Sequence, residues 1–157
     1  MPDRYFKMTR INLIDPKELS DQHLMAEWRE IKMVPAALRR SLKTKSIESI
    51  LKSIPNNYTL GTGHVRFFYD KMIYLKNRYE ILTKELLNRG YNLKNTETFD
   101  SYTKDLPKEF LLDYEPTENA IGIITSRISE KIAMKPGWYR YYGKKLDISK
   151  NCVNIGI

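Results

Sequence analysis

Apolar residues recur with a helical period in the first third of the chain. They lie three, four and seven positions apart: Leu24, Trp28, Ile31, Leu38 and Leu42. This spacing places them on one face of an amphipathic helix. Ser20 or Asp21 can cap the start of this helix by accepting a free backbone N–H. Because Pro35 lies inside the stripe and removes one backbone hydrogen bond, we expect a kink there.

Two further segments have the same period. The longer stripe consists of Val65, Phe68, Met72, Leu75, Tyr79, Leu82 and Leu86, and the shorter of Ile121, Ile124, Ile128 and Ile132. Gly90 is placed to end the longer helix with a left-handed cap. The shorter helix is expected to open near Thr117 and to stop at Pro136-Gly137.

The linkers between these helices, about 44–60 and 91–116, are polar and aperiodic. Seven Gly and seven Pro in 157 residues are few for an all-β protein, which needs many tight turns. The sequence therefore predicts an all-α fold, a compact single domain of three main helices with long polar linkers and a basic, aromatic C-terminal segment.

Composition narrows the class of protein. Cys152 is the only cysteine, so neither an internal disulfide nor a four-ligand structural zinc site can be built around cysteines. No apolar run approaches the roughly 18 residues of a membrane span, and the first residues lack the apolar stretch of a signal peptide. We therefore expect a cytoplasmic protein without a membrane association.

The charge is unevenly placed. The chain carries 27 Lys and Arg against 19 Asp and Glu, a net charge of +8. Residues 27–45 and 127–145 hold six basic residues each, whereas residues 97–118 are mainly acidic. Such a layout favours a face that binds a polyanion, of which nucleic acid is the commonest. A solvated basic surface with no particular partner is the alternative.

Two groups of residues can carry chemistry. His23, Glu27 and Glu30 fall at i, i+4 and i+7, so they share one helix face and suit acid–base work on a sugar-phosphate. The alternative is a solvated, salt-bridged face. The second group is the cationic row Arg127, Lys131 and Lys135, followed directly by the aromatic and basic run of residues 138–145.

In that run, four aromatic residues alternate with three cations: Trp138, Tyr139, Arg140, Tyr141, Tyr142, Lys144 and Lys145. This composition is typical of a surface that contacts phosphates and stacks on bases or sugars. The same aromatics can instead cap the helices as core, and we expect both to hold in part. Residues 61–64, with the sequence GTGH, are read as a helix-entry turn rather than a phosphate site.

Several blocks, taken in order, resemble the phage pyrimidine-dimer DNA glycosylase/AP lyase family, also called ultraviolet-damage endonuclease V. They read MTRINL at 8–13, DQHLMAE at 21–27, GHV at 63–65, FFYDK at 67–71, EKIA at 130–133 and WYRYYGK at 138–144. The resemblance spans roughly residues 8–148. It implies a compact three-helix protein that binds duplex DNA at a cyclobutane pyrimidine dimer, bends it and extrudes a nucleotide.

The resemblance also implies the catalytic residues. The nucleophile is the α-amino group of the threonine after the initiator methionine, which matches Thr9. It attacks the sugar C1′ and forms an imine, and the strand is then cut by β-elimination. The matching glutamate is Glu30, which stabilises positive charge on the sugar and helps to take the C2′ proton.

Further positions match residues that contact the DNA. Those around the flipped sugar and its phosphates are Arg10, Gln22, His23 and Arg29, those on the third helix are Arg127 and Lys131, and those of the C-terminal run are Trp138, Tyr139, Arg140 and Lys144. The implied partner is double-stranded DNA containing pyrimidine dimers or abasic sites, bound by a monomer. No metal or other cofactor is expected.

The chain departs from the family pattern in two places. Met33 stands where the phage enzyme has an arginine at the DNA surface, and Pro35 replaces a non-proline residue. In addition, residues 1–8 precede Thr9, whose nitrogen is then an amide without a nucleophilic lone pair. We expect Met8 to be the true start, with proteolytic trimming as a second possibility.

The expected organisation is thus an extension at 1–8, a glycosylase-like domain at 9–148 and a tail at 149–157. If the extension stays, the alternative function is a damaged-DNA-binding module that does not cleave.

Overall fold

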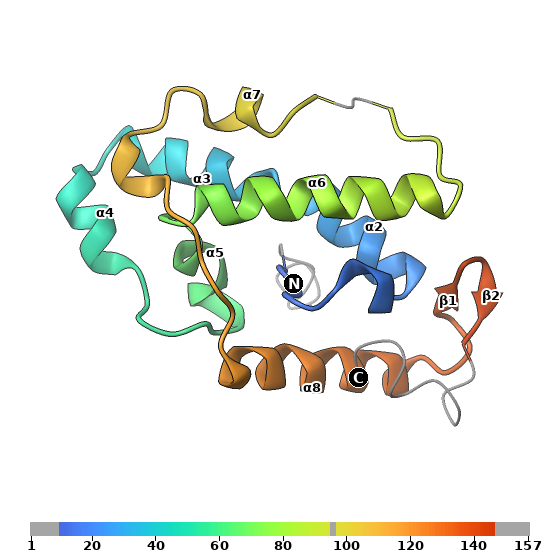
Figure 1. The fold of residues 1–157 in the computed structure, drawn as a ribbon. Helices are drawn as coiled ribbons and strands as arrows, with labels where there is room; N and C mark the ends of the chain where they lie inside the picture. Colours follow the sequence, from blue (N-terminus) through green and yellow to red (C-terminus); the bar gives the residue numbers. More distant parts are fainter. Residues whose placement is uncertain (1–9, 95–96, 147–157) are drawn as a thin grey trace.

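The computed structural model describes residues 10–94 and 97–146 and is mostly helical there (Figure 1). This confirms the predicted class. The helices are α2 (Asp21–Glu30), α3 (Met33–Leu42), α4 (Ile47–Ser53), α5 (His64–Phe67), α6 (Met72–Asn88), α7 (Asp100–Thr103) and α8 (Glu118–Met134). Short 3-10 turns cover Pro16–Glu18, Gly61–Gly63 and Lys108–Phe110. The exception to the all-α prediction is a small antiparallel hairpin of β1 (Arg140–Tyr141) and β2 (Lys144–Lys145).

The first predicted helix is two helices, α2 and α3, separated at Ile31 and Lys32. The break lies one turn before Pro35, where we expected the kink. A proline ring collides with the carbonyl four residues earlier, and for Pro35 that carbonyl belongs to Ile31. Pro35 itself is the third residue of α3, where its missing N–H has little cost. Ser20 caps α2, as predicted, by accepting the backbone N–H of His23 at 3.1 Å.

The second predicted helix is also divided, into α5 and α6, with a turn over residues 68–71. The continuous helix expected there is wrong. Lys71 holds the turn: its ammonium donates to the Phe67 carbonyl at 2.9 Å and to Asp70 at 2.8 Å, and its backbone bridges to Leu111. The predicted glycine cap is confirmed, since Gly90 has a φ of +92°.

The third predicted helix is confirmed as α8. Thr117 caps it by accepting the N–H of Ala120 at 3.0 Å, and the helix ends at Met134, just before Pro136. The isoleucine stripe packs inward, with Ile124, Ile128 and Ile132 buried.

Although the two linkers are polar in composition, several of their side chains are buried in the hydrophobic core. These are Ile50, Tyr58, Phe99, Leu106 and Phe110. The segment that leads into α2, residues 10–20, lies between α6 and α8 (Figure 1). Ile11 and Leu19 of this segment are fully buried. Among residues 10–94 and 97–146, no helix is long and apolar enough to cross a bilayer.

Candidate active site

A cleft of about 380 Å³ opens between α2, α8 and the segment that begins at Arg10. It brings together most of the residues singled out in the sequence: Arg10, Gln22, His23, Glu27, Glu30, Arg127, Lys131, Lys135, Trp138 and Tyr139. These come from distant parts of the chain. The cations of the cleft are Arg10 and three residues of segment 127–145, whereas segment 27–45 contributes Glu27 and Glu30.

Arg10 and Glu30 define the charge of the cleft. Burial lowers the pKa of Arg10, and the nearby Arg127 guanidinium lowers it further. Arg10 and Arg127 both line the cleft, and their positive charges favour an anion there. Burial raises the pKa of Glu30, an effect that Arg10 partly offsets. The cleft therefore combines a cationic wall, formed by Arg10 and Arg127, with the half-buried carboxyl group of Glu30.

His23 is held as a neutral ring. It stacks on Tyr139, with parallel planes and ring centroids 4.7 Å apart. Its Nδ1 lies 2.7 Å from the hydroxyl oxygen of Ser20, which also accepts the His23 backbone N–H. Burial, together with Arg10 and Lys131, lowers the pKa of His23 to about 4. At neutral pH this side chain thus presents an uncharged imidazole to the cleft.

Glu27 does not share the chemistry expected of its helix face. Its carboxylate is completely buried and accepts from Arg78 at 2.7 Å and 3.0 Å and from the Asn12 side-chain amide at 2.9 Å. Arg78 also donates to the carbonyl of Ile14 at 2.6 Å. Glu27 is therefore structural, and Glu30 is the other carboxylate of α2 that lines the cleft.

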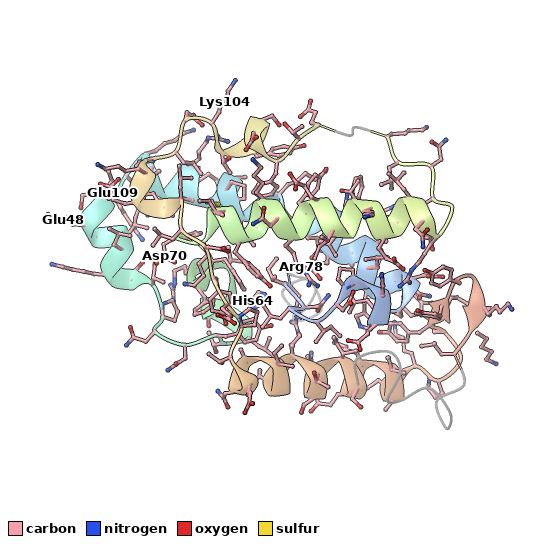
Figure 2. The ribbon with its side chains drawn as sticks, in the orientation of Figure 1. Glu48, His64, Asp70, Arg78, Lys104 and Glu109 are labelled. Carbon is pink, nitrogen blue, oxygen red and sulfur yellow. The ribbon has the colours of Figure 1, made fainter. Side chains whose placement is uncertain are left out.

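Arg78 was not singled out from the sequence, although a signal existed. It lies three residues after Leu75 and four before Leu82, on the apolar stripe of α6. A charged residue on a buried stripe requires a charged partner in the core. Figure 2 shows Arg78 and His64 in the interior, whereas Glu48 and Lys104 lie towards the edge of the molecule.

Gln22 binds the protein's own backbone. Its side-chain amide donates to the Trp138 carbonyl at 2.7 Å, and its oxygen accepts the Arg140 N–H at 2.9 Å. The side chain that resemblance assigned to DNA contact thus fastens the C-terminal segment to α2, at the border of the cleft.

Asp21 strengthens this attachment. Its two carboxylate oxygens accept the backbone N–H groups of Tyr142 at 3.1 Å and Gly143 at 2.8 Å, and a guanidinium N–H of Arg89 at 2.9 Å. The Arg89 guanidinium also packs 4.8 Å and 4.7 Å from the ring centroids of Tyr141 and Tyr142. Nothing in the sequence pattern indicated this network, because its members are distant in the chain.

The aromatic run divides as expected between core and surface. Trp138 is 52% exposed and has the Lys135 ammonium 4.9 Å from its ring centroid, whereas Tyr139 is buried. Arg140 and Lys144 are exposed on the hairpin. These two residues do not line the cleft, although they lie on the segment that borders it.

The remaining positions lie outside the cleft. Arg29 is exposed on a different face of α2, and Met33 is 53% exposed at the start of α3. Residues 61–64 form the helix-entry turn that the sequence favoured, and they place His64 in the core. Thr9, the extension at 1–8 and the whole tail at 149–157, including Cys152, lie outside the described residues.

The sequence over residues 8–98 matches the model of a known family, described as pyrimidine dimer DNA glycosylase. The match covers more than half of the 157 residues. It includes the α2 side of the cleft with Arg10 and Glu30. The α8 side, with Arg127, lies beyond the matched range.

Proposed function

The chain belongs to the pyrimidine dimer DNA glycosylase family, and we propose that it removes the base at a cyclobutane dimer through an imine to Thr9. The family supports the coarser statement directly: the protein is a DNA repair glycosylase whose substrate is DNA containing pyrimidine dimers. The observation that carries the finer proposal is the cleft, which is lined by Glu30 and by Arg10, the residue that follows Thr9 in the sequence.

The reaction begins at the α-amine of Thr9. Its reference pKa of about 7.7–8.0 leaves a useful neutral fraction at physiological pH, and the cationic Arg10 and Arg127 favour that neutral form. The amine attacks the sugar C1′ and loses a proton, and the base departs with the electrons of the glycosidic bond and gains a proton. The C1′–O4′ bond then opens, O4′ takes a proton and becomes a hydroxyl, and an imine links enzyme and sugar.

Glu30 acts in the second half of the reaction, the β-elimination. Its carboxylate stabilises the positive charge of the imine. It then takes a proton from C2′, and the electrons of that bond expel the 3′ phosphate and cut the strand. The raised pKa of Glu30 suits a base that must accept a proton in the cleft.

The cations of the cleft hold the DNA. Arg10, Arg127 and Lys131 supply charge for the phosphates on either side of the lesion. The half-exposed ring of Trp138 at the rim is available to stack on a base or sugar. Abasic sites fit the same scheme, because the imine forms at the same C1′ carbon.

A free amine on Thr9 is the condition on which cleavage depends, and eight residues precede it in the sequence. Borohydride trapping tests this condition, since it reduces an enzyme–DNA imine to a stable adduct. The duplex carries one thymine dimer, and the full chain is compared with a chain that starts at Met8. Adduct from the shorter chain alone would assign the nucleophile to Thr9. Adduct from neither would favour the alternative, a module that binds damaged DNA without cutting it.

Glu30 has its own test. Glu30→Gln should abolish strand cleavage and leave binding of damaged duplex largely unchanged, because the cationic wall is intact. A matched control is Glu80→Gln, which neutralises an exposed glutamate of α6 outside the cleft. Cleavage that persisted in Glu30→Gln would show that the role proposed for this carboxylate is wrong.

A further inference from the structure

The peptide of Ile11 is held from both sides by buried side chains. Its N–H donates to Nε2 of His64 at 2.8 Å, and its carbonyl accepts the hydroxyl of Tyr58 at 2.8 Å. Ile11, Tyr58 and His64 are all at most 4% exposed. Because residues 10–14 belong to no helix or sheet, these side-chain bonds do for this segment what a strand partner does elsewhere.

His64 is fixed in the one tautomer that can hold Ile11. Its Nδ1 lies 2.8 Å from the carbonyl oxygen of Thr59, so Nδ1 must carry the hydrogen and Nε2 is left as an acceptor. Burial lowers the pKa of His64 to about 4, which keeps Nε2 available at neutral pH. The turn before it is tight, because a Cβ on Gly63 would lie 2.9 Å from a methyl carbon of Thr59.

We propose that His64, supported by Tyr58, is a positioning residue that fixes the Ile11 peptide and thereby directs the α-amine of Thr9 into the cleft. The inference rests on the proposed function of Thr9. Thr9 and Ile11 are two positions apart, so the chain between their α-carbons spans at most about 7 Å. The intervening residue is Arg10, which lines the cleft. Anchoring at Ile11 therefore limits where the amine can lie.

A purely structural role for His64 is the competing explanation. The His64 ring makes edge contacts with Tyr58 and Phe68, at centroid distances of 5.3 Å and 5.5 Å. His64→Phe keeps an aromatic ring in this cluster and removes the acceptor for Ile11 together with the donor to the Thr59 carbonyl. His64→Gln keeps a side-chain acceptor and is the conservative variant.

The experiment measures the rate of borohydride-trapped adduct on a duplex with one abasic site, for the full chain and for the chain that starts at Met8. In His64→Phe the rate at saturating DNA should fall by about 10-fold to 100-fold, because a small misplacement of a reacting group has this effect. The half-saturating DNA concentration should stay unchanged, since the cations of the cleft remain. His64→Gln should recover most of the rate.

Thr83→Val is the matched control. It removes a part-buried hydrogen bond of 2.9 Å from the Trp28 indole and touches neither Ile11 nor the cleft. Its trapping rate should equal that of the wild type. Equal rates in wild type and His64→Phe, or equal losses in His64→Phe and Thr83→Val, would overturn the inference and leave the proposed function standing. If the wild type gave no adduct, both the inference and the proposed function would be wrong.

Discussion

Acid should destabilise this protein through two particular residues. The chain contains two histidines, His23 and His64. Both sit in environments that lower the pKa to about 4 in the folded state. In the unfolded chain each imidazole returns to its ordinary pKa of about 6.5. The unfolded state thus binds the protons between these values, and the free energy of unfolding must fall as the pH drops from 6.5 towards 4.

The size of the effect follows from the two pKa values. Between pH 7 and pH 5, linkage gives a loss of about 2 kcal/mol for each histidine and about 4 kcal/mol for both. That is a large part of the stability of an ordinary domain. Glu30 acts in the opposite direction, because a carboxyl whose pKa is raised by folding stabilises the folded state as it takes up a proton.

Urea denaturation followed by circular dichroism at pH 7, 6 and 5 measures this loss. His23→Gln and His64→Gln should each remove about half of the histidine contribution, so that each pH profile is flatter than that of the wild type. The comparison between variants cancels the term from Glu30. A profile that kept its full slope in His64→Gln would show that this ring is already protonated, or exposed, in the folded protein.

Three further predictions concern the residues around the cleft. Glu27→Gln should lower the free energy of unfolding by about 3–5 kcal/mol, because it leaves the buried Arg78 without its carboxylate; a loss that urea denaturation cannot resolve would contradict the buried pair. Arg127→Gln should weaken binding to damaged and undamaged duplex alike and reduce the slope of log affinity against log salt by about one; an unchanged slope would remove α8 from the interface. Asp21→Asn should speed trypsin cleavage after Arg140, because one hairpin N–H loses its acceptor, and equal cleavage rates would argue against that anchor.

The sequence predicted the helical class and those helix ends that depend on local chemistry. Thr117 and Ser20 cap their helices by bonds to residues three positions away, and Gly90 adopts the left-handed conformation that its position requires. The break within the first predicted helix lies one turn before the expected kink, and the break within the second was not predicted. The turn held by Lys71 depends on Leu111, forty residues away, and no periodicity reports such a contact.

The site was predictable in its residue types but not in their partners. A histidine, two glutamates and a cationic row were visible from spacing alone, and the cleft brings them together. Gln22 is an example of a side chain whose partners the sequence did not predict. Resemblance assigns its amide to DNA, yet both polar ends of that amide bind the backbone of residues 138 and 140. The partners of Gln22 thus lie in a segment more than a hundred residues away, and its local sequence does not indicate them.

The environments of Glu27 and Glu30 also could not be predicted from the sequence, and the difference between them matters for the proposed mechanism. They lie three residues apart on one helix and look alike in the sequence, but the fold gives them opposite environments. Glu27 is paired with Arg78, and its side chain is completely buried. Glu30 lies at the cleft, where burial raises its pKa and a cationic wall faces it. A proton acceptor for the C2′ position needs the second environment. The first instead ties α2 to α6 and to Asn12 in the N-terminal segment, so the buried pair holds in place the helix that carries Glu30, the proposed base.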